Sequence, residues 1–248
     1  MKVKHLVGAF LCVLGCYACS SPKTEVQSPD GHIKMTLTVD ENGKPFYNVS
    51  VDDSLLIENS AMGFTAANGI ILAEGFQVKN TTFSSEDETW TQPWGENKKN
   101  RNHYNEMAVS LTNEDQVQLT LRFRVFDDGI GFRYEYTVPT VDSLLITDEL
   151  TTFRFHRDGT SWSIPASAET YELLYQQQPI SEVETANTPF TFKTADGVYG
   201  SIHEAALYDF PEMTLKQIGH YTLKAELAPW PDGIKARKGN HFTTSWRT

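Results

Sequence analysis

The stretch Val117-Gln-Leu-Thr-Leu-Arg-Phe-Arg-Val-Phe-Asp-Asp-Gly-Ile-Gly-Phe-Arg-Tyr-Glu-Tyr136 decides the fold predicted for this chain. Apolar and polar residues alternate in its first half and again in its last five residues, and Asp127-Asp-Gly129 lies between the two runs. A period of two is typical of a strand with one buried face, and an Asp-Gly pair is a common hairpin turn. The stretch is therefore predicted to form two antiparallel strands with an aliphatic and aromatic inner face.

The same pattern recurs along the chain. Alternating segments occur at 33–39, 47–51, 153–155, 190–192 and 221–227, and Asp-Gly turn signals follow at 158–159, 196–197 and 232–233. Strands with one apolar face pack sheet on sheet. No strong helical period, internal repeat or long low-complexity linker interrupts the pattern. We expect an all-β fold made of one large antiparallel β-sandwich.

The charge of the chain excludes some classes of partner. The formal net charge of the 248 residues is -11 at pH 7. An acidic protein is repelled by nucleic acid and by anionic membrane surfaces. Neutral ligands such as sugars, and bound cations, remain compatible with this charge.

The N-terminus is predicted to be a lipoprotein signal peptide, residues 1–18. Lys2 and Lys4 precede a short apolar run at 6–14, which is too short to span a bilayer. Cys16 and Cys19 each follow small residues, as in a bacterial lipobox, and Ser-Ser-Pro-Lys after Cys19 favours Cys19 as the lipidated residue. An ordinary secretory signal with incidental cysteines is the alternative.

This assignment divides the chain into a signal peptide, a tether at 19–25 and a domain at 26–248. The protein is expected to be exported to the periplasm or outer membrane and to touch the membrane only through a lipid anchor. All three cysteines lie at or before Cys19, so the mature domain holds no disulfide and no thiol nucleophile.

The segment 88–106 is the first candidate site. It gathers Trp90, Trp94 and His103 with several asparagines and glutamates, and Pro93 and Gly95 interrupt it. Because no apolar period runs through it, we predict a long loop whose aromatic faces stack on a polar ligand. The alternative is a structural loop whose tryptophans plug the end of the core.

Two further groups of polar residues are candidates. His203 and Glu204 are adjacent, so they can line one pocket only at a strand end or a bulge, because neighbouring side chains on a strand face opposite ways. The segment 164–175 carries Glu169 and Glu172. Arg133 and Glu135 are predicted to form a cross-strand pair instead of a site. No Gly-x-Ser-x-Gly, His-Glu-x-x-His or phosphate-loop motif is present.

Four motifs in order resemble the N-terminal domain of glycoside hydrolase family 97, the bacterial α-glucosidases and α-galactosidases. They are Glu-Thr-Trp…Pro-Trp-Gly-Glu…Arg-Asn-His-Tyr-Asn-Glu (88–106), Arg-Val-Phe-Asp-Asp-Gly-Ile-Gly-Phe-Arg-Tyr-Glu (124–135), His-Glu-Ala-Ala-Leu (203–207), and Trp-Pro-Asp-Gly…Ser-Trp-Arg-Thr (230–248). The resemblance covers nearly the whole mature chain. It implies a β-super-sandwich like that of the galactose mutarotases.

The resemblance also implies partners and a cofactor. In the family a (β/α)8 barrel follows this domain and carries the catalytic acid and the base or nucleophile, so no catalytic residue is expected in this chain. The sandwich helps to close the site for an α-linked oligosaccharide and supplies one glutamate to a calcium ion. Glu172 resembles that glutamate, and Glu169 is the alternative. Calcium prefers hard carboxylate oxygens.

The chain ends on Ser245-Trp-Arg-Thr248, where the family continues into another strand and then the barrel. We therefore expect the sandwich to lack its final strand or strands, and the chain alone to be an incomplete glycosidase. In this interpretation Trp90, Trp94 and His103 lie near an interdomain cleft, and together with His203 and Glu204 they are the candidate sugar contacts.

Three functions remain open from the sequence. The first is the accessory, carbohydrate-binding domain of an exported α-glycosidase. The second is a free-standing sugar-binding surface lipoprotein. The third is a mutarotase-like epimerase that uses His103 or His203 with a carboxylate as acid and base.

Overall fold

The computed structural model describes residues 24–67 and 69–248 as five antiparallel sheets. The predicted signal peptide, with Cys16 and Cys19, lies outside the described residues. The strands form because alternate residues bury their side chains in the core. From Gln118 to Phe126 the first residue is exposed, and the following residues are buried and half-buried in turn. Within the described part, the only helical element is the 3₁₀ turn η1 (Ile180–Glu182), and no helix there is long and apolar enough to cross a membrane.

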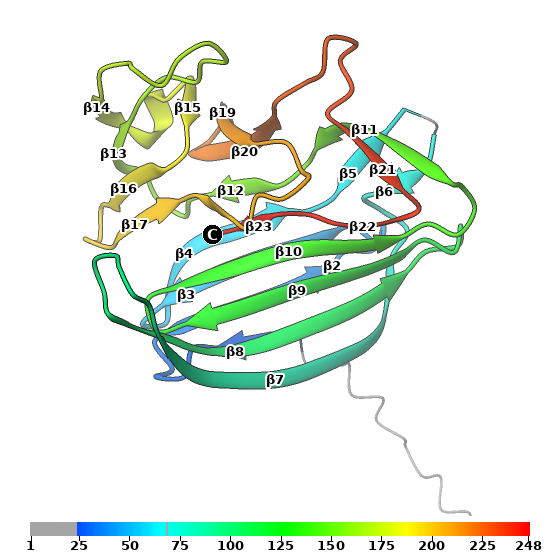
Figure 1. Ribbon diagram of the computed structural model, residues 1–248, viewed down its shortest axis with the longest axis horizontal. Coiled ribbons are helices and arrows are strands. Elements are labelled where there is room, and N and C mark those ends of the chain that lie inside the picture. Colours follow the sequence, from blue (N-terminus) through cyan, green and yellow to red (C-terminus); the bar gives the residue numbers. More distant parts are fainter. Residues whose placement is uncertain (1–23, 68) are drawn as a thin grey trace, which may run out of the picture.

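The largest sheet has seven strands, and Figure 1 shows four of them, β7 to β10, running side by side. Its order is β18-β23-β10-β9-β8-β7, with β22 also paired to β10. The bounds are β7 (Gln77–Thr91), β8 (Lys99–Thr112), β9 (Gln118–Phe126), β10 (Gly129–Thr137), β18 (Glu204–Ala205), β22 (His241–Thr243) and β23 (Trp246–Arg247). The hairpin predicted from 117–136 is confirmed as β9 and β10, joined in register from Phe126–Gly129 to Gln118–Thr137.

Four smaller sheets complete the sandwich. The first, behind the large sheet in Figure 1, has β1 (Glu25–Gln27), β2 (Ile33–Val39), β3 (Pro45–Val51) and β4 (Ser54–Ala61). The second has β21 (Ala236–Gly239), β11 (Ser143–Glu149), β5 (Phe64–Ala66) and β6 (Ile71–Leu72). The third has β12 (Thr152–Arg154), β20 (Thr222–Leu227), β19 (Met213–Gly219) and β15 (Thr185–Asn187). The fourth has β14 (Gln176–Pro179), β13 (Gly159–Ser163), β16 (Phe190–Thr194) and β17 (Tyr199–Ile202).

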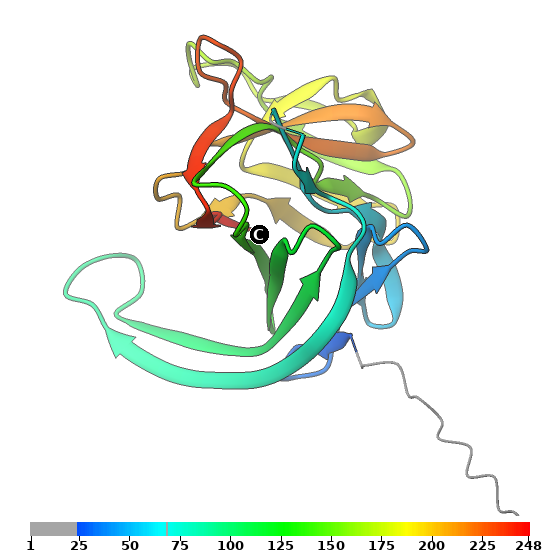
Figure 2. The same cartoon turned by 90° about the vertical axis from the view of Figure 1, so that its right-hand side faces the viewer.

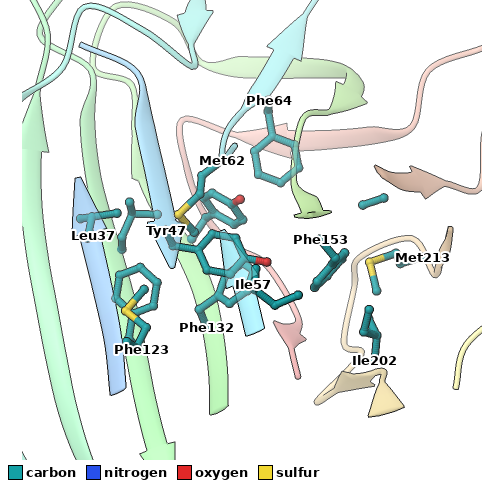
Figure 3. Close-up of a cluster of buried hydrophobic side chains, with 14 of the residues drawn as sticks. Leu37, Tyr47, Ile57, Met62, Phe64, Phe123, Phe132, Phe153, Ile202 and Met213 are labelled. Atoms are coloured by element: carbon teal, nitrogen blue, oxygen red, sulfur yellow. The ribbon is translucent and has the colours of Figure 1, made fainter. Parts of the chain in front are cut away.

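One continuous core lies between these sheets. Figure 3 shows side chains from opposite layers converging: Leu37 and Tyr47 face Phe123 and Phe132, and the cluster continues toward Phe64. The rings of Tyr47 and Phe132 lie 5.0 Å apart. The Tyr47 hydroxyl donates to the Thr152 carbonyl at 2.8 Å, so the polar end of this buried ring is satisfied. The predicted all-β sandwich is therefore confirmed.

The segment 88–106 differs from its prediction. Most of it is strand: β7 and β8 pair continuously from Phe83–Met107 out to Thr91–Lys99, and only residues 92–98 form a loop. Figure 2 shows the two strands bending into an arc whose tip reaches out on the side of the sheet opposite to β1–β4. We call residues 84–105 the arm. Its strands lack an apolar period because their outer half has no core to cover, and that is why the loop prediction was wrong.

Candidate functional site

The tip of the arm presents two tryptophans to solvent. The side chain of Trp94 is 85% exposed and that of Trp90 is 48% exposed, so neither ring plugs the core. The tip is braced from within, because the Gln92 side chain donates to the Asn97 carbonyl at 3.0 Å. A large apolar ring held out on a braced turn is available for contact with a ligand or with another domain.

Polar side-chain pairs between β7 and β8 hold the two strands of the arm together. Arg101 binds both carboxylate oxygens of Asp87, at 2.7 and 2.8 Å, and Asn102 donates to Glu88 at 2.9 Å. His103 lies nearer the body of the sheet, with Nδ1 3.5 Å from Asp127 on the β9–β10 turn. His103 is therefore some way along the strand from the tip tryptophans and does not form one cluster with them.

The outer face of the large sheet carries a ladder of charges, of which only Arg133 and Glu135 were predicted from the sequence to form an ion pair. Glu106 accepts from Arg122 at 2.5 Å and from Arg124 at 2.8 Å, and Glu135 accepts from Arg122 and Arg133, each at 2.8 Å. These five side chains lie on β8, β9 and β10. Charge-assisted bonds of this kind fix the side chains in one arrangement. We call these five residues the charge ladder.

The indole ring of Trp246, on β23, packs against two arginines of the charge ladder. The guanidinium carbons of Arg124 and Arg133 each lie 4.7 Å from the Trp246 ring centroid. A signal for the ladder did exist in the sequence, because Arg122 and Arg124 alternate with buried residues and must share the outer face.

The charge ladder predicts how acid affects stability. Burial raises the pKa of Glu135, but hydrogen bonds from Arg122 and Arg133 outweigh it and leave the pKa lowered from 4.5. A lowered carboxyl pKa contributes stability above the unfolded pKa, and this contribution is lost as pH falls through the folded pKa. In urea titrations from pH 7 to pH 3, Glu135→Gln should therefore lose less stability than the wild type. A Glu41→Gln control, at an exposed turn, should follow the wild-type curve; equal slopes for Glu135→Gln and wild type would refute the prediction.

Glu204 belongs to a buried ion-pair network. The guanidinium of Arg247, which has no exposed surface, contacts Glu204 at 2.7 Å and Glu149 at 2.9 and 2.5 Å. The second oxygen of Glu204 accepts from the Met213 amide at 2.7 Å, so it closes the base of the loop 206–212. Burial raises the pKa of Glu204, partly offset by Arg247. With both oxygens engaged inside the protein, Glu204 positions a loop and is poorly placed to meet a sugar.

His203 faces a different environment from Glu204. It falls between β17 and β18, its backbone pairs with Thr248 in both directions at 2.8 and 2.9 Å, and its side chain is exposed. It lines a cavity of about 600 Å³ together with Asp127. The rest of the cavity lining is mostly apolar and includes Phe132, Phe153 and Phe192. Asp127, Asp128 and His203 are among the polar groups of the same lining.

Glu172 lies in the connection between β13 and β14, residues 164–175. The backbone amide of Glu172 donates to the Thr170 hydroxyl at 3.0 Å. The side chains of Glu172 and Glu169 are both exposed. Tyr171 beside it donates to Glu212 at 2.6 Å, and this bond raises the pKa of Tyr171 to about 12. The bond ties the connection to the loop 206–212 whose base Glu204 closes.

A calcium ion needs six to eight oxygens. Among residues 24–67 and 69–248 no group of three or more His, Cys, Asp or Glu could hold a metal. No hydrogen bond or ion pair in the described part of the chain engages the carboxylate of Glu172, which is exposed.

The fold and these elements define the N-terminal sandwich domain of a glycosidase family. The chain belongs to glycoside hydrolase family 97, because the family model described as "Glycosyl-hydrolase 97 N-terminal" matches residues 26–248. The resemblance drawn from the four sequence motifs is confirmed.

The relatives compared here are longer than this chain. A retaining alpha-galactosidase from Bacteroides thetaiotaomicron is 25% identical over 246 residues, which cover 92% of this chain and 36% of the relative. Solved structures of a family 97 enzyme from Pseudoalteromonas sp. strain K8, in complex with panose or with acarbose, are 38% identical with a TM-score of 0.86, covering 90% of this chain and 34% of theirs. A beta-arabinopyranosidase, 20% identical with a TM-score of 0.81, shares the fold. The chain thus spans about a third of the length of these relatives.

Proposed function

We propose that residues 26–248 are the accessory domain of an exported α-glycosidase. This domain docks on a catalytic barrel and completes the binding site for an α-linked oligosaccharide. One observation carries the proposal: large apolar side chains are exposed on linked loops of a family 97 domain. Leu174 is 90% exposed and Tyr208 is 81% exposed. Exposed apolar groups concentrated in this way mark an interaction surface.

Several contacts fix the conformation of the loop 206–212, as expected for a docking surface. Tyr208 projects between Ala206 and Asp209, which both adopt positive φ, 51° and 48°. The Tyr171–Glu212 bond, the Glu204–Met213 bond and a Lys238–Asp209 ion pair of 2.9 Å hold the loop at three points. Strain of this kind persists where the surrounding contacts impose it, often at functional sites. A pinned loop loses little conformational freedom on docking.

The relatives support the proposed class of ligand. The Pseudoalteromonas enzyme was solved with panose and acarbose, and the Bacteroides relative is a retaining alpha-galactosidase. We infer an α-linked glucoside or galactoside as the substrate of the assembled enzyme. Hydrolysis itself would be carried out by carboxylates of the barrel, while this domain contributes Glu172 to calcium and aromatic surface to the sugar.

The test is a chimera in which residues 26–248 replace the corresponding domain of the Pseudoalteromonas enzyme. The chimera should hydrolyse aryl α-glucosides or α-galactosides in a calcium-dependent manner, whereas the barrel expressed without the sandwich should be insoluble or at least tenfold less active. Equal activity of the barrel with and without residues 26–248 would contradict the proposal.

A free-standing sugar-binding lipoprotein is the second candidate, and the exposure of Trp90 and Trp94 favours it. It requires saturable quenching of tryptophan fluorescence by malto- or galacto-oligosaccharides with the chain alone. Loss of that quenching in Trp94→Ala, but not in a Trp230→Ala control, would support this candidate. Flat titrations would leave the accessory-domain function.

A further inference from the structure

The fourth sheet, β14-β13-β16-β17, turns one face toward the core and the other toward solvent. In Figures 1 and 2 it lies at the opposite end of the molecule from β7 and β8. Its strands pair in unbroken register, so alternate residues share a face. Ser161, Phe192 and Ile202 are buried on the inner face. The outer face carries exposed and half-buried side chains, and we call six of them the platform: Thr160, Trp162, Thr191, Lys193, Tyr199 and Ser201.

Two aromatic rings form the centre of the platform. The ring centroids of Trp162 on β13 and Tyr199 on β17 lie 6.5 Å apart across β16, with an angle of 14° between the ring planes. The Lys193 ammonium lies 5.0 Å from the Tyr199 ring centroid, a cation–π contact that helps to hold the ring. The Tyr199 side chain is 65% exposed and therefore open to a ligand. Because the ring planes are nearly parallel, a flat ligand that stacks on one ring also lies parallel to the other.

The polar groups of the platform have no partner of their own. Within residues 24–67 and 69–248, no hydrogen bond or ion pair engages the side chains of Thr160, Thr191, Lys193 or Ser201. The charge ladder differs in this respect, because arginines of the same sheet hold its carboxylates. Hydroxyls without a partner can both donate to a ligand and accept from it. The platform contains no acidic residue, so it offers nothing that would attract a cation.

The size of the face indicates what kind of ligand it takes. Four paired strands span about 14 Å, and four or five residues along a strand span about 15 Å, so the face covers about 200 Å². A stable protein–protein interface needs about 800 Å² on each partner. The face alone is therefore too small for a protein partner, but it can hold a few sugar rings. A pyranose presents apolar C–H faces and hydroxyl edges, which match aromatic rings flanked by hydroxyls.

We propose that the platform is a saccharide-binding site of this domain. A pyranose of an α-linked oligosaccharide stacks on Trp162 and Tyr199. Thr191 lies opposite both Trp162 and Ser201 in the strand register, so the hydroxyls of Thr191 and Ser201 hydrogen-bond to the edge of the sugar. Only the α-linkage of the ligand rests on the proposed function. The site needs neither a catalytic barrel nor calcium, and it does not involve the tryptophans of the arm.

Calorimetric titration of the chain from Ser20 onward with maltotriose tests the site. Saturable binding is expected, and Trp162→Ala and Tyr199→Ala should each weaken it about tenfold, because each removes an aromatic stacking surface. Trp94→Ala is the control, since it removes an exposed ring from the tip of the arm and should leave the affinity unchanged. A flat titration would overturn the proposal, as would a loss in Trp94→Ala that Trp162→Ala and Tyr199→Ala do not share.

A hydroxyl of the platform can be removed while the shape of the face is kept. Thr191→Val retains a branched side chain but should weaken maltotriose binding about fivefold, because one hydrogen bond to the sugar is lost. Thr38→Val is the matched control, since Thr38 is exposed on β2 in another sheet. Equal affinities of Thr191→Val and the wild type would overturn the arrangement given to the ligand.

Cellotriose, the β-linked counterpart of maltotriose, tests the linkage separately. Weaker binding of cellotriose than of maltotriose would support an α-linked ligand. Stronger binding of cellotriose would contradict the α-linkage taken from the proposed function, while losses in Trp162→Ala and Tyr199→Ala would still support the platform. The two proposals therefore fail separately: an inactive chimera counts against the accessory-domain function, and a flat titration of the chain alone with both sugars counts against the platform.

Discussion

Replacement of Arg247 by methionine is expected to lower the free energy of unfolding by about 3–5 kcal/mol. Arg247 is fully buried between Glu149, which is also fully buried, and Glu204, whose side chain is 5% exposed. Loss of the guanidinium would leave two carboxylates facing each other without a counter-charge. Because whole domains are stable by only about 5–15 kcal/mol, this one change should bring the protein close to unfolding.

Urea denaturation monitored by tryptophan fluorescence gives the measurement. Arg154→Met is the matched control, since Arg154 is half exposed and lies 3.5 Å from Glu58, and an exposed pair contributes about 0–1 kcal/mol. If Arg247→Met does not fold, Arg247→Met combined with Glu149→Gln and Glu204→Gln should restore part of the stability, because the unpaired charges are gone. A loss below about 1 kcal/mol for Arg247→Met would refute the role given to the network.

The second large effect is expected at Glu172, in the chimera with the catalytic barrel. Glu172→Gln should weaken calcium binding about 100-fold, or about 2.8 kcal/mol, because a charged oxygen ligand becomes a neutral one. The concentration of calcium needed for half-maximal hydrolysis should rise by the same factor. Glu182→Gln, at the exposed turn η1, is the control and should leave the calcium dependence unchanged.

Glu169→Gln completes this comparison. If it carries the large effect and Glu172→Gln does not, the ligand has been assigned to the wrong glutamate of the 164–175 connection. If neither substitution changes the calcium dependence, the sandwich supplies no ligand and this part of the proposed function fails.

The sequence predicted those parts of the fold that cover a core. The run Ile33 to Val39 is β2 with the expected bounds, and the hairpin 117–136 became β9 and β10. In these strands burial of alternate residues produces a period that can be read directly. In the outer part of the arm no residue is buried from Ser84 to Thr91 or from Lys99 to His103, so no period exists there and the strands were taken for a loop.

The polar contacts were harder to foresee, because they join residues far apart in the chain. Glu149 and Arg247 are 98 positions apart, and neither residue alone indicates a buried ion pair. Arg133 and Glu135 were expected to pair across strands. They contact each other along β10, while the cross-strand partner of Glu135 is Arg122. The assignment of Glu172 depends on family resemblance, since an exposed glutamate has no pattern that distinguishes a ligand.

The central claim is that the calcium and sugar site is shared between this domain and a catalytic barrel. Calorimetric titration of the chain from Ser20 onward with calcium, beside the chimera, tests this most directly. We predict no micromolar binding to the chain alone and micromolar binding to the chimera, because one carboxylate cannot replace six to eight oxygens. Micromolar binding to the chain alone that Glu172→Gln abolishes would contradict a shared site.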